Sequence, residues 1–171
     1  MQRFPKFDYS LVTFCSIEKA LDLVQYFDLH NIPDGPIDIS ALWDWFDVRV
    51  MDLPLATWGF TMDMAQNGIV IAVNRLLPPS RQLFTFGHEV GHVLMHHPDQ
   101  LLTCLTGSQE EQVDYNRLEV EATTIAAYLL IPQKAVIENL HCYGIKHIAS
   151  EYMVPEELVV IRWVLYKRTG V

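Results

Sequence analysis

The spacing of hydrophobic and polar residues divides the chain into a helical start, a short region of strands and a long helical second half. Ser16 is predicted to cap a first helix. Apolar residues then recur at helical spacing, at Ile17, Ala20, Leu21, Val24 and Phe27. A turn-rich connector covers 31–36, and a short helix is predicted over 39–46.

In the middle of the chain the pattern changes to that of β-strands. Three short segments, 48–53, 58–64 and 68–74, are rich in β-forming residues. The Asn67-Gly68 pair between the last two favours a tight hairpin turn. These features predict a small antiparallel sheet of about three strands.

Beyond residue 80 every pattern is helical, with helices predicted over 81–97, 112–131, 133–142, 145–152 and 155–168. Helices on both sides of one segregated sheet define an α+β fold in which the sheet packs on a helical bundle. A chain of 171 residues has the usual length of one domain. We therefore predict a single domain over 1–171, with an N-terminal helix and connector over 1–35.

The composition of the chain limits the cellular environment and the binding partners that we expect for it. Half of the residues are hydrophobic, 19% are charged and the formal net charge is −9, so the chain is globular and repels nucleic acids and anionic membranes. Its three cysteines are too few and too far apart for a disulfide framework. No signal peptide or membrane-spanning run is apparent. We expect a cytoplasmic protein with no membrane and no direct nucleic-acid partner.

The segment His88-Glu89-Val90-Gly91-His92 has the pattern H-E-x-x-H. On a helix, residues four apart lie one above the other, so both imidazoles can bind the same zinc ion. Glu89 lies about 100° further round the helix axis and can reach a water held by the metal without binding the metal itself. The motif predicts two metal ligands and a general base.

Two histidines leave a tetrahedral zinc site short of one protein ligand. The extended pattern H-E-x-x-H-x-x-G-x-x-H is excluded, because Met95 and Pro98 occupy the positions of its glycine and third histidine. His96 and His97 are near misses. We expect both to end the helix and to interact favourably with its C-terminal dipole.

The other source of a third ligand is a carboxylate on a later helix. Glu119 and Glu121 lie in an otherwise apolar segment, where an unpartnered carboxylate is costly. Small residues follow Glu119 at helical offsets, namely Ala122, Thr123 and Ala126, and let another helix approach closely. We predict Glu119 as the ligand and keep Glu121 as the alternative.

Taken together, these segments resemble the ImmA/IrrE family of metallopeptidases. The resemblance covers about 36–168 and includes, in order, the strand IVIAVN, the run RQLFTFGHEVGH and the helix EVEATTIAAYLLIP. It implies a zincin-like fold in which His88, His92 and Glu119 bind Zn²⁺, with Mn²⁺ as a second candidate, and Glu89 is catalytic. The family carries Asn or Asp four residues after the third ligand, where this chain has Thr123. A threonine hydroxyl can still orient a metal-bound histidine, with less reach.

The resemblance implies a metalloendopeptidase that cleaves a helix-turn-helix repressor in a stress-response or mobile-element switch. Two other hypotheses stay open. One is a non-cleaving zinc-containing regulator that binds a repressor or an antitoxin-like partner. The other is DNA binding through the helix pair 145–152 and 155–168, but Glu156 and Glu157 lie where a recognition helix would begin, so we expect this pair to close the core.

Catalysis by such a site also needs a group that stabilises the oxyanion. The sequence does not rank the candidates, which are Tyr115, Tyr128, Tyr143, His96, His97, His141 and His147.

Overall fold

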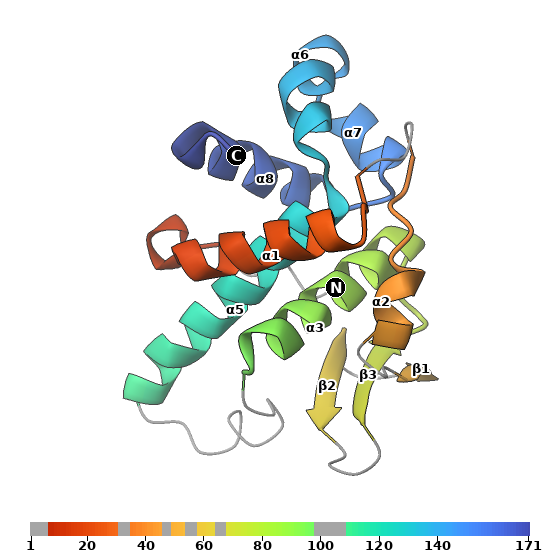
Figure 1. Cartoon of the computed structure of the whole chain (residues 1–171), viewed down its shortest axis with the longest axis vertical. Coiled ribbons are helices and arrows are strands. Elements are labelled where there is room, and N and C mark those ends of the chain that lie inside the picture. The colour runs from red at the N-terminus through yellow and green to blue at the C-terminus, as the bar shows by residue number, and fades with distance from the viewer. Residues whose placement is uncertain (1–6, 31–34, 46–48, 54–57, 64–67, 98–108) are drawn as a thin grey trace.

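The computed structural model describes residues 7–30, 35–45, 49–53, 58–63, 68–97 and 109–171 (Figure 1). It has the predicted α+β character, with a small sheet packed against helices. In chain order its elements are the 3-10 turn η1 (Tyr9–Leu11), α1 (Phe14–Tyr26), α2 (Ser40–Trp45), β1 (Arg49–Leu53), β2 (Gly59–Asp63), β3 (Ile69–Asn74), α3 (Pro79–Met95), α5 (Gln109–Leu130), the π-helical turn η3 (Ala135–Asn139), α6 (Leu140–Tyr143), α7 (Ile145–Glu151) and α8 (Glu156–Thr169).

The first helix begins one turn earlier than predicted. Thr13, and not Ser16, is the N-cap: its hydroxyl oxygen accepts a hydrogen bond from the Ser16 backbone amide at 3.3 Å. The prediction of Ser16 as the cap was wrong because its own hydroxyl donates back to the Thr13 carbonyl at 2.8 Å and lies buried inside the first turn.

The sheet is mixed, whereas the sequence predicted an antiparallel one. Its strand order is β1-β3-β2. β2 pairs antiparallel to β3, but β1 pairs parallel to β3. The central position falls to β3 because it is the most apolar strand, with 70–74 all buried, so consecutive strands β1 and β2 lie on either side of it. The predicted turn at Asn67 lies outside the described residues.

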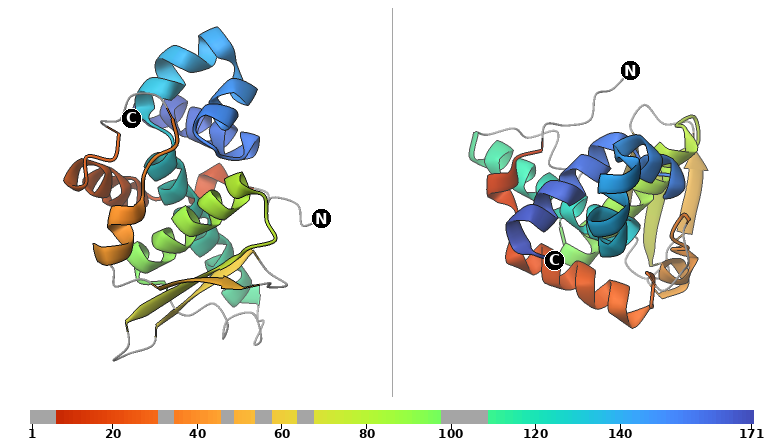
Figure 2. Two further views of the ribbon diagram at one scale, coloured as in Figure 1. Left: turned by 90° about the vertical axis from the view of Figure 1, so that its right-hand side faces the viewer. Right: turned by 90° about the horizontal axis from the view of Figure 1, so that it is seen from above.

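Helix α3 packs against both the sheet and α5, and α1 also packs against α5, where its Lys19 Nζ donates to the Leu94 carbonyl of α3 at 2.6 Å (Figures 1 and 2). The crossing of α3 and α5 is very close, because a Cβ built on Gly91 would lie 2.7 Å from the Ala122 Cα. One turn earlier Gly87 faces Ala126, whose Cβ would lie 3.6 Å from such an atom. The small residues that follow Glu119 therefore do admit another helix, as predicted.

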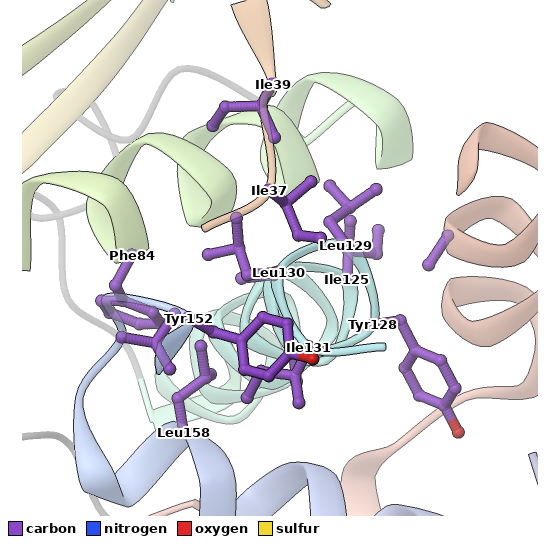
Figure 3. Packing of buried hydrophobic residues seen from close by; sticks show 14 of the residues in the cluster. Ile37, Ile39, Phe84, Ile125, Tyr128, Leu129, Leu130, Ile131, Tyr152 and Leu158 are labelled. Carbon is purple, nitrogen blue, oxygen red and sulfur yellow. The ribbon is translucent and has the colours of Figure 1, made fainter. Parts of the chain in front are cut away.

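The hydrophobic core surrounds the C-terminal part of α5 and the residues just after it, where every residue over 120–132 is buried (Figure 3). A helix that is apolar on all sides needs cover on all sides. Phe84 of α3, Leu158 of α8 and the segment that carries Ile37 and Ile39 supply part of it. The predicted role of the last two helices in closing the core is confirmed, since Ile148, Leu158, Ile161 and Leu165 are all buried. Within the described ranges, no helix combines the length and hydropathy needed to cross a membrane.

Candidate metal centre

Helix α3 places His88 and His92 one turn apart on the side that faces α5. Their Nε2 atoms are 3.1 Å apart. His92 is buried, and the His88 side chain is only 12% exposed. Because both rings are held on the same helix, their relative position follows from helix geometry alone.

Glu119 of α5 completes the cluster. Its Oε2 lies 3.4 Å from the Nε2 of His88, and its Oε1 lies 3.4 Å from the Nε2 of His92. The close approach of Gly91 to Ala122 is what brings this carboxylate within reach of both rings. Among the described residues, His88, His92 and Glu119 are the group of donor atoms that could hold a metal ion, all within 4.8 Å of one another.

The spacing of these donors fits a divalent metal ion. Zinc bonds to nitrogen and oxygen are about 2.0–2.2 Å long, so neighbouring ligands of a tetrahedral ion lie about 3.4 Å apart. The three separations in the cluster are 3.1, 3.4 and 3.4 Å. Two imidazole nitrogens and a carboxylate that converge in this way are a set of ligand atoms that a divalent cation such as zinc can bind.

The pKa shifts point the same way. Burial is the largest influence on His92 and lowers its pKa to about 4, so the ring is neutral at physiological pH. Burial would raise the pKa of Glu119, but its close contacts with the imidazoles of His88 and His92 outweigh burial and hold the pKa well below its usual range. Burial would likewise lower the pKa of His88, but contact with Glu119 outweighs it and raises the pKa. The site therefore favours a positive charge between these groups.

Glu89 lies beside the cluster and points toward the sheet. It is buried, and its Oε2 accepts a hydrogen bond from the Thr61 hydroxyl of β2 at 2.7 Å. Burial, the largest influence, raises the pKa of Glu89. Strand β2 can approach α3 closely because Gly59 has no side chain. A Cβ at Gly59 would lie 2.5 Å from Thr85 Cγ2 of α3 and 2.6 Å from the Ala72 carbonyl oxygen of β3.

Each histidine of the motif has a different partner on its outer nitrogen. The Nδ1 of His88 lies 3.1 Å from the Thr123 hydroxyl, the residue that the sequence predicted to orient a ligand. The Nδ1 of His92 lies 2.8 Å from the Nδ1 of His97. His97 in turn contacts Glu121, with 3.1 Å between its Nε2 and the Oε2 of the carboxylate.

Two sequence interpretations need correction here. His97 does not simply end the helix, because its ring is buried against His92. Glu121, kept as the alternative ligand, lies behind His92 and not in the cluster of converging donors. Thr61 could not be predicted from the sequence, since it lies 28 residues from Glu89 on a separate strand and no spacing rule joins the two.

Some of the oxyanion candidates have contacts elsewhere in the fold. The Tyr128 hydroxyl donates to the Val171 carbonyl at 3.0 Å. His141 packs edge-on against Trp163, and the ring of Tyr143 lies tilted against that of His147. The contacts of these four side chains are with the C-terminal residue Val171 or within the C-terminal helices.

Comparison with known proteins agrees with this geometry. The model of the IrrE N-terminal-like domain family matches residues 44–164. A curated relative, the radiation response metalloprotease IrrE of Deinococcus radiodurans, is 32% identical over 75 residues. That alignment covers 44% of this chain and 23% of the relative, so the chain spans only about a quarter of the length of the protein it matches.

The fold and the cluster of two histidines and a glutamate define a metallopeptidase-like domain. The chain belongs to the IrrE N-terminal-like domain family, as the sequence resemblance predicted.

Proposed function

We propose that this protein is a zinc-dependent endopeptidase, with manganese as the second candidate metal. The observation that carries the proposal is the convergence of His88, His92 and Glu119 at tetrahedral spacing, with the buried carboxylate of Glu89 next to them. In this proposal His88, His92 and Glu119 are the metal ligands, Glu89 is the general base and Thr123 orients His88. The zincin-like character of the fold is part of the same proposal.

A divalent cation in this site would polarise the scissile carbonyl and lower the pKa of a water molecule toward about 7. Glu89 accepts the proton of that water and donates it to the leaving amine. Burial raises the pKa of Glu89, which suits a group that must both take and return a proton. The Thr61 hydroxyl holds Oε2, so the carboxylate keeps one orientation.

For the substrate we propose an extended segment of a helix-turn-helix repressor. Within the described sheet β2 pairs only with β3, so its other edge can accept a peptide strand close to Glu89. The net charge of −9 favours a basic partner, as DNA-binding proteins generally are. A stress response in the cytoplasm is the proposed setting, supported by the name of the relative from Deinococcus radiodurans.

The test is a cleavage assay with purified protein, zinc or manganese, and the helix-turn-helix protein encoded next to its gene, analysed by mass spectrometry. We expect one specific cut. Glu89→Gln should retain the metal and cut at least about 100-fold more slowly, because general acid-base catalysis contributes about 10²–10⁴-fold. Cleavage by this variant at the wild-type rate would show that Glu89 is not the base.

The same assay tests the hypothesis of a non-cleaving regulator. One zinc per chain and tight repressor binding, with no cut under any metal, would replace the peptidase by a regulator. The contact of Thr123 with His88 is the feature that keeps this hypothesis open, since a hydroxyl supports a ligand more weakly than a carboxylate.

A further inference from the structure

A line of buried side chains leads away from His92 and connects α3 to α5. The first link joins the Nδ1 atoms of His92 and His97, which are 2.8 Å apart. The second joins His97 Nε2 to Glu121 Oε2 at 3.1 Å. Arg117 closes the line at the surface, where its Nε donates to Glu121 Oε1 at 3.2 Å.

The backbone at the end of α3 makes the first link. His96 is the C-cap and takes the left-handed conformation, with φ of 54°. This turns the chain back on the helix, so that the His97 amide donates to the His92 carbonyl at 3.0 Å. The two rings then lie with their centroids 5.0 Å apart. The two adjacent histidines thus differ in role: His96 forms the left-handed turn, and this turn places the ring of His97 against that of His92.

Burial shows that these contacts are built into the fold. The side chains of His97 and Glu121 are only 5% and 3% exposed. A carboxylate and an imidazole lose much of their hydration at such depth and need well-formed hydrogen bonds in return. Arg117, by contrast, is 56% exposed and reaches the carboxylate from solvent.

The chemistry of the three groups fixes where the protons lie. An ionised carboxylate can only accept hydrogen bonds, so the Nε2 of His97 must donate to Glu121. A neutral His97 then has an unprotonated Nδ1, which must accept from the Nδ1–H of His92. His92 is left with an unprotonated Nε2, which lies 3.1 Å from the Nε2 of His88 and can accept a hydrogen bond from that ring in the metal-free protein. That is the form of histidine that binds a metal.

We infer that His97 and Glu121 are positioning residues that hold His92 in its Nδ1–H tautomer, with Nε2 free to bind the metal. Glu121 thereby determines, through its hydrogen bond with His97, which nitrogen of His92 carries the proton. This inference rests on the metal site of the proposed function. It adds a role for two residues that are not ligands and that touch neither substrate nor metal.

The tautomer of His92 can be observed directly. Long-range ¹H–¹⁵N correlation spectra of the metal-free wild-type protein near neutral pH should show His92 protonated at Nδ1 and His97 at Nε2. Glu121→Gln keeps the shape of the side chain but can also donate from its amide, so both rings should become tautomer mixtures. Glu138→Gln makes the same change at an exposed residue and should leave both rings as in the wild type.

Metal affinity gives the second measurement. Chelator competition should show zinc bound about 10–100-fold more weakly by Glu121→Gln, as expected when the outer partner of a metal-bound histidine is lost. The absorption bands of the cobalt-substituted protein should also shift, which a general loss of stability would not cause. His97→Gln should behave in the same direction.

The outcomes separate the two proposals. His92 protonated at Nε2 in the wild-type protein would overturn the inference, and so would an unchanged tautomer and zinc affinity in Glu121→Gln. Because the spectrum of the wild type decides the tautomer, the inference is tested even if the variants do not fold. A wild-type protein with the expected tautomer that binds neither zinc nor manganese would instead refute the proposed function.

Discussion

The two halves of α5 both bring polar groups into apolar surroundings, but they satisfy them differently. In the first half, Glu119 and Glu121 meet the imidazoles that follow from α3. In the second half, the only charged group that packs against the buried face of Tyr128, among the described contacts, is Arg162 of α8. The two halves differ in whether protein groups alone satisfy the buried polar side chains or whether an added ion is expected.

In the second half, protein groups supply the partners of the buried charge of Arg162. The Arg162 Nε donates to the Ile131 carbonyl at 3.3 Å and its Nη1 donates to the Val171 carbonyl at 3.0 Å. The centre of its guanidinium lies 4.0 Å from the centroid of the Tyr128 ring. Burial lowers the pKa of Arg162 to about 10, which still leaves it charged at neutral pH. Here the chain itself supplies the cation.

The first half instead presents a set of converging ligand atoms at its centre. The Nε2 atoms of His88 and His92 face each other and the Glu119 carboxylate, and each can offer electrons. The outer nitrogens are satisfied by protein groups, but these inner atoms converge on one point. A buried polar cluster whose acceptor atoms converge on one point therefore indicates a bound ligand. A buried cluster in which each donor has a protein acceptor indicates a structural role.

The largest expected effect is that of Glu119→Ala on metal binding. Removing one of the three converging donors should weaken zinc binding by more than about 100-fold, since losing only an outer partner costs about 10–100-fold. Arg162→Met should leave zinc affinity unchanged. Both affinities can be measured by chelator competition, and equal losses in the two variants would abolish the distinction between the halves of α5.

The next largest effect is that of Gly91→Ala on folding. The new Cβ would lie 2.7 Å from the Ala122 Cα and 2.8 Å from its carbonyl oxygen, both backbone atoms that cannot move aside. We expect a loss of about 3 kcal/mol in the free energy of unfolding. Gly87→Ala is the matched control, because its new Cβ meets the flexible Leu130 side chain at 3.1 Å. Urea unfolding should show a clearly smaller loss there.

A smaller effect is expected for Arg162→Met on stability. The change leaves the buried Ile131 carbonyl without its donor, which costs about 1–3 kcal/mol. Loss of the contact with the Tyr128 ring adds to this, while the smaller cost of burying an uncharged side chain opposes it. Thermal and urea unfolding measure the balance, and a more stable variant would mean that the guanidinium costs more than its contacts return.

The smallest effect concerns His30, whose Nε2 lies 2.9 Å from the Leu129 carbonyl in the same half of α5. Burial, the largest influence, lowers its pKa below the ordinary 6.5. Below pH 6.5 the unfolded chain therefore binds more protons at this residue than the folded chain, so stability falls as the pH falls. In His30→Gln the loss of stability between about pH 6.5 and 5 should be less steep. An unchanged slope in urea unfolding would assign the pH dependence to other groups.

Local spacing explains how far the sequence could predict the site. His88, Glu89 and His92 share one helix, so their arrangement follows from its geometry. Glu119 could be predicted because the small residues after it indicated a close helix crossing, which the contact of Ala122 with Gly91 confirms. The α+β character followed from periodicity in the same way.

What the sequence did not predict depends on contacts between distant segments or on backbone conformation. The parallel pairing of β1 depends on which strand takes the centre of the sheet. Thr61 reaches Glu89 only because β2 lies against α3. His97 contacts His92 because His96 takes the left-handed conformation, and two adjacent histidines do not by themselves specify such a turn.

The position of β2 has a cost in solution. Among the described residues β2 pairs along one edge alone, and such an edge exposes backbone donors and acceptors to any extended segment, including β2 of a second copy. Such pairing would cover the edge of β2, the strand that carries the Thr61 contact to Glu89. If the proposed peptidase function holds, the protein would then compete with its own substrate at high concentration, and specific activity should fall as the protein concentration rises.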